Sequence, residues 1–288
     1  MMSKLNLGNG KYVTVNKKFD TDIYCHTIVC FDDNFSVNNF INGQLQEGKV
    51  SKIIVVGSKP QVQYSNNVVF THKLTKRLLK DSEQVFFMVN VDTDEFVINN
   101  LIRLKDICDE LAIPLGLRIK MDIVLGNIIK DDSDMVVTLK ALFTTNNLRS
   151  RYEMIYDYIC DNLDELFQKN NFCQFENDKC IYNRHDKSEY NVMGCCYSFK
   201  YHSLLGCPVS FYDISLCKHL RSHSCSVKCL GCKLFTCKYL RKRGIVFKLD
   251  YMVIAKGFFT KGQRELLRTT FFVTKEEVLD KLMKKCRG

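Results

Sequence analysis

The spacing of apolar residues in the first half of the chain changes between the period of strands and that of helices. Short alternating stretches at 11–15 and 27–31 are separated by Asn- and Gly-containing turns, as is typical of strands and their loops. Apolar runs at 53–56 and 85–91 flank a short segment with helical spacing at 74–79. This pattern predicts a fold of the α+β or α/β class, with an N-terminal mixed sheet and helices.

The most regular unit is a β-α-β motif that spans 85–124. Its first strand ends in an acidic Asp-Thr-Asp-Glu run at 92–95, which supplies an N-cap and a glutamate for the first turn of a helix. Apolar residues then recur at helical spacing until Pro114, and 115–124 returns to the pattern of a strand. The two strands are expected to be parallel.

Candidate catalytic residues are few. Asp92, Asp94 and Asp122 could place carboxylates at neighbouring strand ends, where they would suit Mg²⁺, although a helix cap is the favoured interpretation. The chain has no Walker, HExxH or nucleophile-elbow motif. No catalytic residue is therefore assigned, and whether the protein is an enzyme stays open.

Two amphipathic helices are expected in the second half of the chain. One covers about 150–169 and carries an aromatic stripe that includes Tyr156, which is typical of core contacts. The last helix opens with a capping box at 274–277 and ends in basic residues, the order that its dipole favours. Composition divides the chain into an α/β domain at 1–148 and a helix plus cysteine-rich domain at 149–288.

The N-terminal sequence, MMSKLNLGNGKYVTV, lacks the apolar segment of a signal peptide. No stretch approaches the roughly 20 uninterrupted apolar residues that a membrane span needs. We therefore expect a cytoplasmic protein with no membrane association. Because the cytosol keeps thiols reduced, its 15 cysteines need an explanation other than disulfides.

Ten of these cysteines fall between residues 173 and 237, and hydrophobic filler cannot explain so many in one short segment. Zinc and iron both bind thiolates, and ligands two to four residues apart can converge on one ion. This density predicts a metal-binding module with short helices. Its expected metal ligands are Cys173, Cys180, Cys195, Cys196, Cys207, Cys217, Cys225, Cys229, Cys232 and Cys237.

The four cysteines at 225–237 have the spacing of metal ligands throughout. Gly231 lies between two of them, where a backbone bend without a Cβ is useful. A helix is predicted at 233–243, followed by Gly244 as its C-terminal cap. Cys237 would then lie on the first turns of this helix and point back at the loop.

The identity of the metal stays open between zinc and a [4Fe-4S] cluster. The triple Cys225-x3-Cys229-x2-Cys232 has the spacing that radical-SAM enzymes use for such a cluster. Only 56 residues follow Cys232, which is too few for the barrel of those enzymes. His219 and His223 flank the cysteines and are candidates either for metal ligation or for hydrogen bonds to thiolates.

A Cys-Cys pair at 195–196 is followed by the segments LCKHL at 216–220, SCSV at 224–227 and CKLF at 232–235. In this order the segments resemble the YkgJ-type cysteine-cluster family, whose members are described as zinc- or iron-chelating domains. The resemblance covers about 173–240 and implies a chelating function for this part of the chain.

Positive charge is concentrated at the end of the chain. Residues 1–199 carry a net charge of −3 and residues 200–288 carry +13. Such a segment can compensate metal-bound thiolates or contact nucleic acid. In the second case the nucleic-acid contact stripe would consist of Lys238, Arg241, Lys242, Arg243 and Lys248.

The leading hypothesis is a cytoplasmic metalloprotein whose cysteine-rich module holds zinc or an iron–sulfur cluster, with the metal structural or redox-responsive. One alternative is a nucleic-acid-binding protein that uses the basic C-terminal segment. A second alternative is an iron–sulfur enzyme.

Overall fold

The computed structural model describes residues 2–16, 25–31, 43, 45–57, 67–90, 95–120, 133–172, 175–176, 179–180, 197–203, 210–216, 220–221, 224–225 and 227–285. The chain divides into two compact units, Met1–Asn146 and Asn147–Gly288, next to the boundary expected at residue 148. None of the helices in these ranges is long and apolar enough to cross a membrane.

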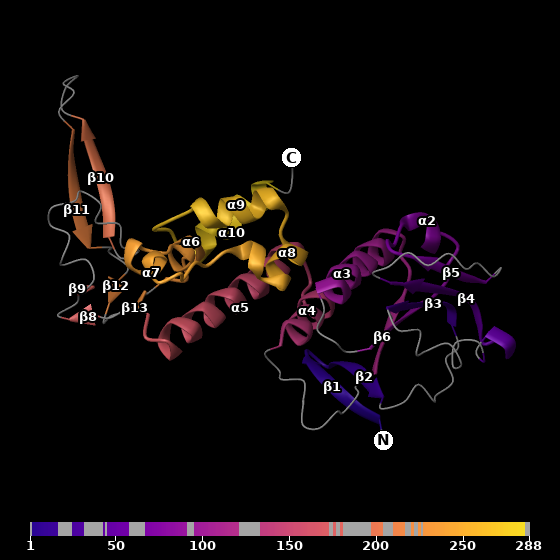
Figure 1. The fold of residues 1–288 in the computed structure, drawn as a ribbon. Coiled ribbons are helices and arrows are strands. Elements are labelled where there is room, and N and C mark those ends of the chain that lie inside the picture. The colour runs from indigo at the N-terminus through magenta and orange to yellow at the C-terminus, as the bar shows by residue number, and fades with distance from the viewer. Residues whose placement is uncertain are drawn as a thin grey trace. The chain divides into compact units, whose positions relative to one another are not determined.

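The first unit is built around a seven-stranded sheet with the order β1-β2-β7-β6-β3-β4-β5 (Figure 1). β1 and β2 form an antiparallel hairpin, and every other pair of neighbouring strands is parallel. This sheet and its helices confirm the predicted mixed α/β class. The strands are β1 (Met2–Gly8), β2 (Lys11–Asn16), β3 (Cys25–Phe31), β4 (Val50–Val56), β5 (Val68–Thr71), β6 (Val85–Asn90) and β7 (Leu115–Lys120).

The order of the parallel strands is that of a doubly wound sheet. From the central strand β3 the chain runs outward through β4 to β5, crosses to β6 on the other side of β3, and continues to β7. In such sheets ligands bind at the carboxyl ends of the strands where the order reverses, here β3 and β6. Asp92 and Asp94, which follow β6, and Asp122, which follows β7, lie outside the described residues.

The central strands are buried on both faces, as parallel sheets require. On one face Ile28, Ile53 and Met88 pack together with the partly buried Leu45. On the other face the ring of Phe31 lies 6.0 Å from that of Phe96, at the start of α3. The helices of this unit with described bounds are α2 (Lys76–Leu79), α3 (Glu95–Glu110) and α4 (Asp134–Phe143). The parallel pairing of β6 with β7 across α3 confirms the predicted β-α-β motif.

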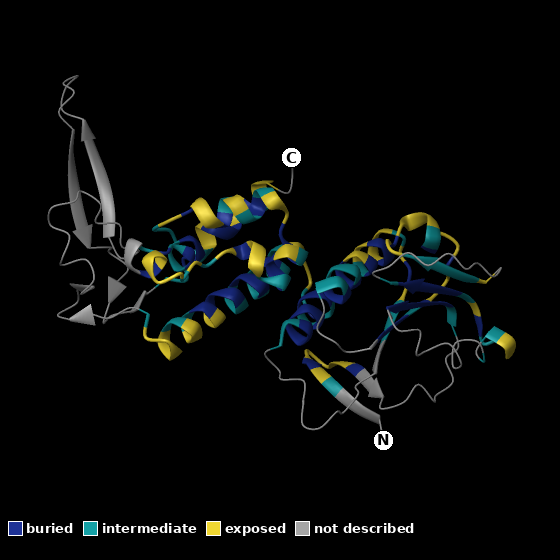
Figure 2. Ribbon diagram, viewed as in Figure 1, coloured by how far each residue is buried: buried dark blue, intermediate teal, exposed yellow. Residues whose placement is uncertain are grey.

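The second unit contains one long helix, α5 (Leu148–Lys169), whose buried stripe is visible in Figure 2. This helix confirms the prediction at 150–169, and Asn147 caps it by accepting a hydrogen bond from the N–H of Ser150 at 2.8 Å. The shorter helices that follow in the described residues are α6 (Leu230–Leu234), α7 (Lys238–Lys242), η2 (Leu249–Tyr251), α8 (Val253–Phe258), α9 (Lys261–Thr269) and α10 (Lys275–Lys285).

Three short antiparallel pairs lie in sequence between α5 and α6. They are β8 (Phe175–Glu176) with β9 (Lys179–Cys180), β10 (Tyr197–Ser203) with β11 (Ser210–Leu216), and β12 (Leu220–Arg221) with β13 (Ser224–Cys225). The backbone pairing is described for these strands, and it places Cys180 and Cys225 each at the end of a strand.

The prediction of one continuous helix at 233–243 is wrong, because two short helices, α6 and α7, occupy this region with a break between them. At the break the hydroxyl of Thr236 contacts the carbonyl of Leu234 and accepts a hydrogen bond from the N–H of Phe247. The predicted end of α7 is confirmed: Gly244 has a φ of 74°, and the N–H of Ile245 bonds to Leu240 O at 3.0 Å.

Capping boxes begin the last two helices. In α10 the N–H of Thr274 donates to the Glu277 carboxylate at 2.8 Å, and the N–H of Glu277 donates to the Thr274 hydroxyl at 3.3 Å. This geometry confirms the predicted box. The equivalent box of α9, which is formed by Thr260 and Gln263, was not predicted.

Candidate metal centre

Two of the predicted ligands, Cys229 and Cys232, lie together at the start of α6. Cys229 is the N-cap residue with an extended backbone, and Cys232 lies on the first turn, where the thiol of Cys232 donates a hydrogen bond to the sulfur of Cys229. Cys229 is buried and Cys232 is half-buried. The helix start therefore brings two sulfurs within hydrogen-bonding distance in a largely water-excluded site.

Backbone groups of the segment after α9 surround these two sulfurs. The N–H of Phe272 donates to Cys232 Sγ at 3.3 Å, and Cys229 Sγ lies 3.5 Å from the carbonyl oxygen of Thr270. Phe272 has a φ of 59°, which is uncommon for a residue with a side chain. The segment thus adopts a strained turn in which backbone donors face the thiols.

The pKa of the Cys229 thiol is lowered to about 6. The largest cause is the hydrogen bond from Cys232, and backbone N–H groups that include that of Val273 act in the same direction. Burial opposes the shift, because it disfavours the charged thiolate. The lowered pKa favours the thiolate, which is the form of cysteine that binds metal.

Gly231 allows α6 to approach the end of α9 closely. A Cβ built on Gly231 would lie 2.1 Å from Thr270 O and 3.0 Å from Leu267 O. Both contacts involve backbone, so no side-chain rotation would relieve them. Gly231 was expected to serve a bend between ligands. It serves close helix packing instead, which holds the cysteines against the 270–273 segment.

Tyr156 on α5 fixes the other side of the segment that carries the two cysteines, residues 228–233, which we call the cysteine loop. Its hydroxyl accepts a hydrogen bond from the N–H of Leu230 at 2.8 Å and donates one to the carbonyl of Lys228. The phenol is fully buried, and burial raises its pKa. One turn further along α5, burial also raises the pKa of the Cys160 thiol. Cys160 is thus a neutral core residue.

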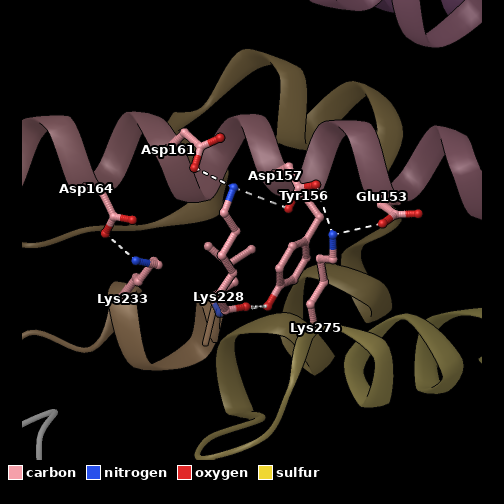
Figure 3. Close-up of polar contacts among 9 residues, drawn as sticks. Glu153, Tyr156, Asp157, Asp161, Asp164, Lys228, Lys233 and Lys275 are labelled. Atoms are coloured by element: carbon pink, nitrogen blue, oxygen red, sulfur yellow. Dashed lines mark hydrogen bonds and ion pairs between the residues drawn. The ribbon is translucent and has the colours of Figure 1, made fainter. Parts of the chain in front are cut away.

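Four carboxylates follow one side of α5, and three lysines from the cysteine loop and α10 pair with them (Figure 3). We call these carboxylates the acidic ridge; they are Glu153, Asp157, Asp161 and Asp164. The lysine pairs are Lys275 with Glu153 at 2.8 Å and Asp157 at 3.1 Å, Lys228 with Asp161 at 2.6 Å, and Lys233 with Asp164. A longer ion pair joins Lys228 to Asp157 at 3.6 Å, beyond hydrogen-bonding distance.

These pairs change the interpretation of the positive charge. Lys228 and Lys233 flank the two cysteines in sequence, where they could compensate thiolates. Their ammonium groups are instead paired with carboxylates of α5. The lysines around the cysteine loop thus contribute to docking this loop on α5.

The other expected ligands are not assembled with this pair in the described part of the chain. Cys237 is half-buried and is the N-cap residue of α7. For Cys180 and Cys225 the backbone alone is described. In the residues that the structure describes, no group of three or more His, Cys, Asp or Glu side chains is placed to hold a metal ion. The expected ligands outside the described residues are Cys173, Cys195, Cys196, Cys207, Cys217, His219 and His223.

Sequence reasoning identified the cysteines but missed the groups that hold them. It assigned Tyr156 to the core, which is correct, without its two hydrogen bonds to the loop. A tyrosine on the buried face of a helix is itself a signal, because its hydroxyl needs a partner. The role of the 270–273 segment carries no comparable signal, since it depends on contacts between distant residues.

Comparisons of the chain with protein-family models, with curated proteins and with solved structures find no match.

Proposed function

We propose that the C-terminal unit is a metal-binding module in which Cys229 and Cys232 supply two thiolate ligands to zinc or to a [4Fe-4S] cluster. The observation that carries this proposal is the convergence of both sulfurs on one buried site lined by backbone N–H donors. Metal ligands must be deprotonated, and the lowered pKa of Cys229 meets this requirement near neutral pH. Two thiolates with two residues between them match the ligand spacing of structural zinc sites.

Two thiolates do not complete a metal site, since structural zinc takes four ligands and a [4Fe-4S] cluster is held by four cysteines. Cys225 and Cys237 are the nearest further cysteines in sequence and the first candidates for the remaining positions. The similarity of 173–240 to the YkgJ-type family supports chelation by the whole segment. The other candidate ligands are Cys173, Cys180, Cys195, Cys196, Cys207, Cys217, His219 and His223.

A structural or redox-responsive role for the metal fits the attachment of the loop. Tyr156, the acidic ridge and the 270–273 segment hold the cysteine pair on the helical core. A bound metal would add crosslinks between this pair and cysteines elsewhere in the segment, and metal binding of this kind contributes directly to folding free energy.

The decisive experiment is elemental analysis of the full chain purified without oxygen and without chelators. We expect stoichiometric zinc or iron in the wild type and reduced metal content in Cys229→Ser and Cys232→Ser. The matched control is Cys25→Ser, because Cys25 is a half-buried cysteine on β3 of the other unit. A wild-type preparation that contains neither metal yet folds normally would disprove the proposal.

Absorption spectroscopy of the same preparation separates the two cofactors. An iron–sulfur cluster gives a brown protein with charge-transfer absorption, whereas a zinc–thiolate site is colourless. A colourless protein that contains zinc would also remove the iron–sulfur enzyme from consideration.

A further inference from the structure

The segment 238–251, which spans α7 and η2, carries a marked excess of positive charge. It contains five basic residues and one acidic residue, Asp250. The carboxylate of Asp250 accepts a hydrogen bond from Arg264 Nε at 2.7 Å, so its charge is compensated within the unit. The Asp250 carboxylate therefore does little to offset the field of the lysines and arginines in this segment.

Three cations of this segment differ from the lysines that dock on α5. Arg241, Lys242 and Lys248 are exposed, and within the described residues no ion pair joins them to a carboxylate. Lys228 and Lys233, by contrast, are paired with the acidic ridge. The charge of the C-terminal unit thus has two parts, one used in packing and one directed to solvent.

An exposed aromatic ring lies beside one of these cations. The side chain of Tyr251 is 71% exposed, the most of any large hydrophobic side chain among the described residues. The ammonium of Lys248 lies 5.2 Å from the centre of this ring. Single-stranded nucleic acids use this combination of an exposed aromatic ring and adjacent positive charge, with a base stacked on the ring and phosphates on the cations.

We propose that Tyr251, Lys248 and the exposed cations of α7 form a binding surface for single-stranded nucleic acid. Stacking on Tyr251 requires an unpaired base, which favours a single strand over a duplex. A membrane surface fits less well, because interfacial helices present an apolar face to lipid, whereas Leu240 of α7 is buried in the unit. This inference does not depend on the proposed metal.

The test is fluorescence anisotropy of a labelled single-stranded RNA of about 12 uridines with the full chain. Affinity is expected to fall steeply between about 50 and 200 mM salt. Tyr251→Ala should weaken binding about 10- to 100-fold, while Tyr251→Phe, which keeps a ring for stacking, should bind like the wild type. The triple variant Arg241→Gln, Lys242→Gln, Lys248→Gln should reduce the slope of log affinity against log salt by about 2.

The charge-matched control is the triple variant Lys261→Gln, Lys281→Gln, Lys284→Gln, which removes three exposed lysines from α9 and α10. It should retain most of the affinity and leave Tyr251-dependent stacking intact. An equal loss in this control, equal affinity for duplex RNA, or no binding at about 50 mM salt would each overturn the proposal. Competition by polyglutamate or by anionic vesicles as effective as that by RNA would overturn it in favour of another acidic partner. The metal content of each variant, which should not change, separates this result from the metal proposal.

Discussion

The hydroxyl of Tyr156 and the backbone N–H of Leu230 are joined by a hydrogen bond of 2.8 Å that links α5 to the loop carrying Cys229. The same hydroxyl donates to the carbonyl of Lys228, so one side chain satisfies a backbone donor and a backbone acceptor. Both backbone groups lie where the loop enters α6, a position at which a helix leaves N–H groups without partners. Tyr156 thus acts as a cap for α6 that is supplied from another helix.

Replacement of Tyr156 by phenylalanine tests this role. The substitution keeps the buried ring and leaves the N–H of Leu230 and the carbonyl of Lys228 without their partner, which costs about 1–3 kcal/mol. Hydrogen exchange measured by mass spectrometry on peptides covering 227–234 should show faster exchange in the variant. Tyr251→Phe, the same change on an exposed ring, is the control and should leave this protection unaltered. Unchanged exchange in Tyr156→Phe would contradict the capping role.

Replacement of Gly231 by alanine should separate α6 from the end of α9. The added Cβ would overlap the carbonyl of Thr270, and overpacking of this kind costs about 1–3 kcal/mol. Reduced stability of the C-terminal unit and a lower metal content are expected, measured by urea unfolding and elemental analysis. Gly262→Ala is the matched control, because a Cβ there meets the flexible end of the Lys285 side chain. Equal stability of the two variants would argue against the close approach.

Alkaline pH should destabilise the C-terminal unit. Burial raises the pKa of Cys160 above 9.0 and that of Tyr156 above 10.0, so the folded state favours the neutral thiol and phenol. The unfolded state releases these protons at lower pH, and its ionisation then favours unfolding. Lys275 acts in the same direction: its pKa is raised above 10.5, first through the hydrogen bond with Glu153, so the folded state favours its charged form. The contribution of these three groups to stability is therefore complete below pH 9 and is lost as the pH rises above it.

Tyrosinate absorbance and circular dichroism followed in one alkaline titration check this expectation. Ionisation of the buried tyrosine should coincide with loss of helical signal. Tyr156→Phe should remove part of the pH dependence, although it lowers stability at neutral pH. Gradual ionisation of all tyrosines with an unchanged helical signal would count against the prediction.

Local patterns were sufficient for the elements that local interactions determine. The capping box at Thr274 and the glycine that ends α7 at Gly244 both act within a few residues, and the structure has both as predicted. The β-α-β motif at 85–124 was also evident, because its strands and helix are strongly apolar and well punctuated. For the same reason the predicted start of α5 lies within two residues of the observed one.

The remaining features depend on contacts between distant residues, which periodicity does not report. The 233–243 segment has helical spacing, but it is divided into two helices at Thr236, whose hydroxyl contacts Leu234 O and the N–H of Phe247. The spacing of Cys229 and Cys232 predicted that the two lie close together. The hydrogen bond from the N–H of Phe272 to Cys232 Sγ could not be predicted in this way. The order of the seven strands likewise requires knowledge of which strands are neighbours.

The hairpin of β1 and β2 has a consequence for how the protein is made. Although these strands are synthesised before the other strands of the sheet, β2 joins the parallel sheet by pairing with β7, with Thr14 opposite Arg118. On the ribosome the hairpin therefore cannot pair with β7 until residues 115–120 have left the exit tunnel. The edge of β2 that faces β7 thus stays open until β7 is made, and a chaperone that meets the nascent chain would meet this edge unpaired.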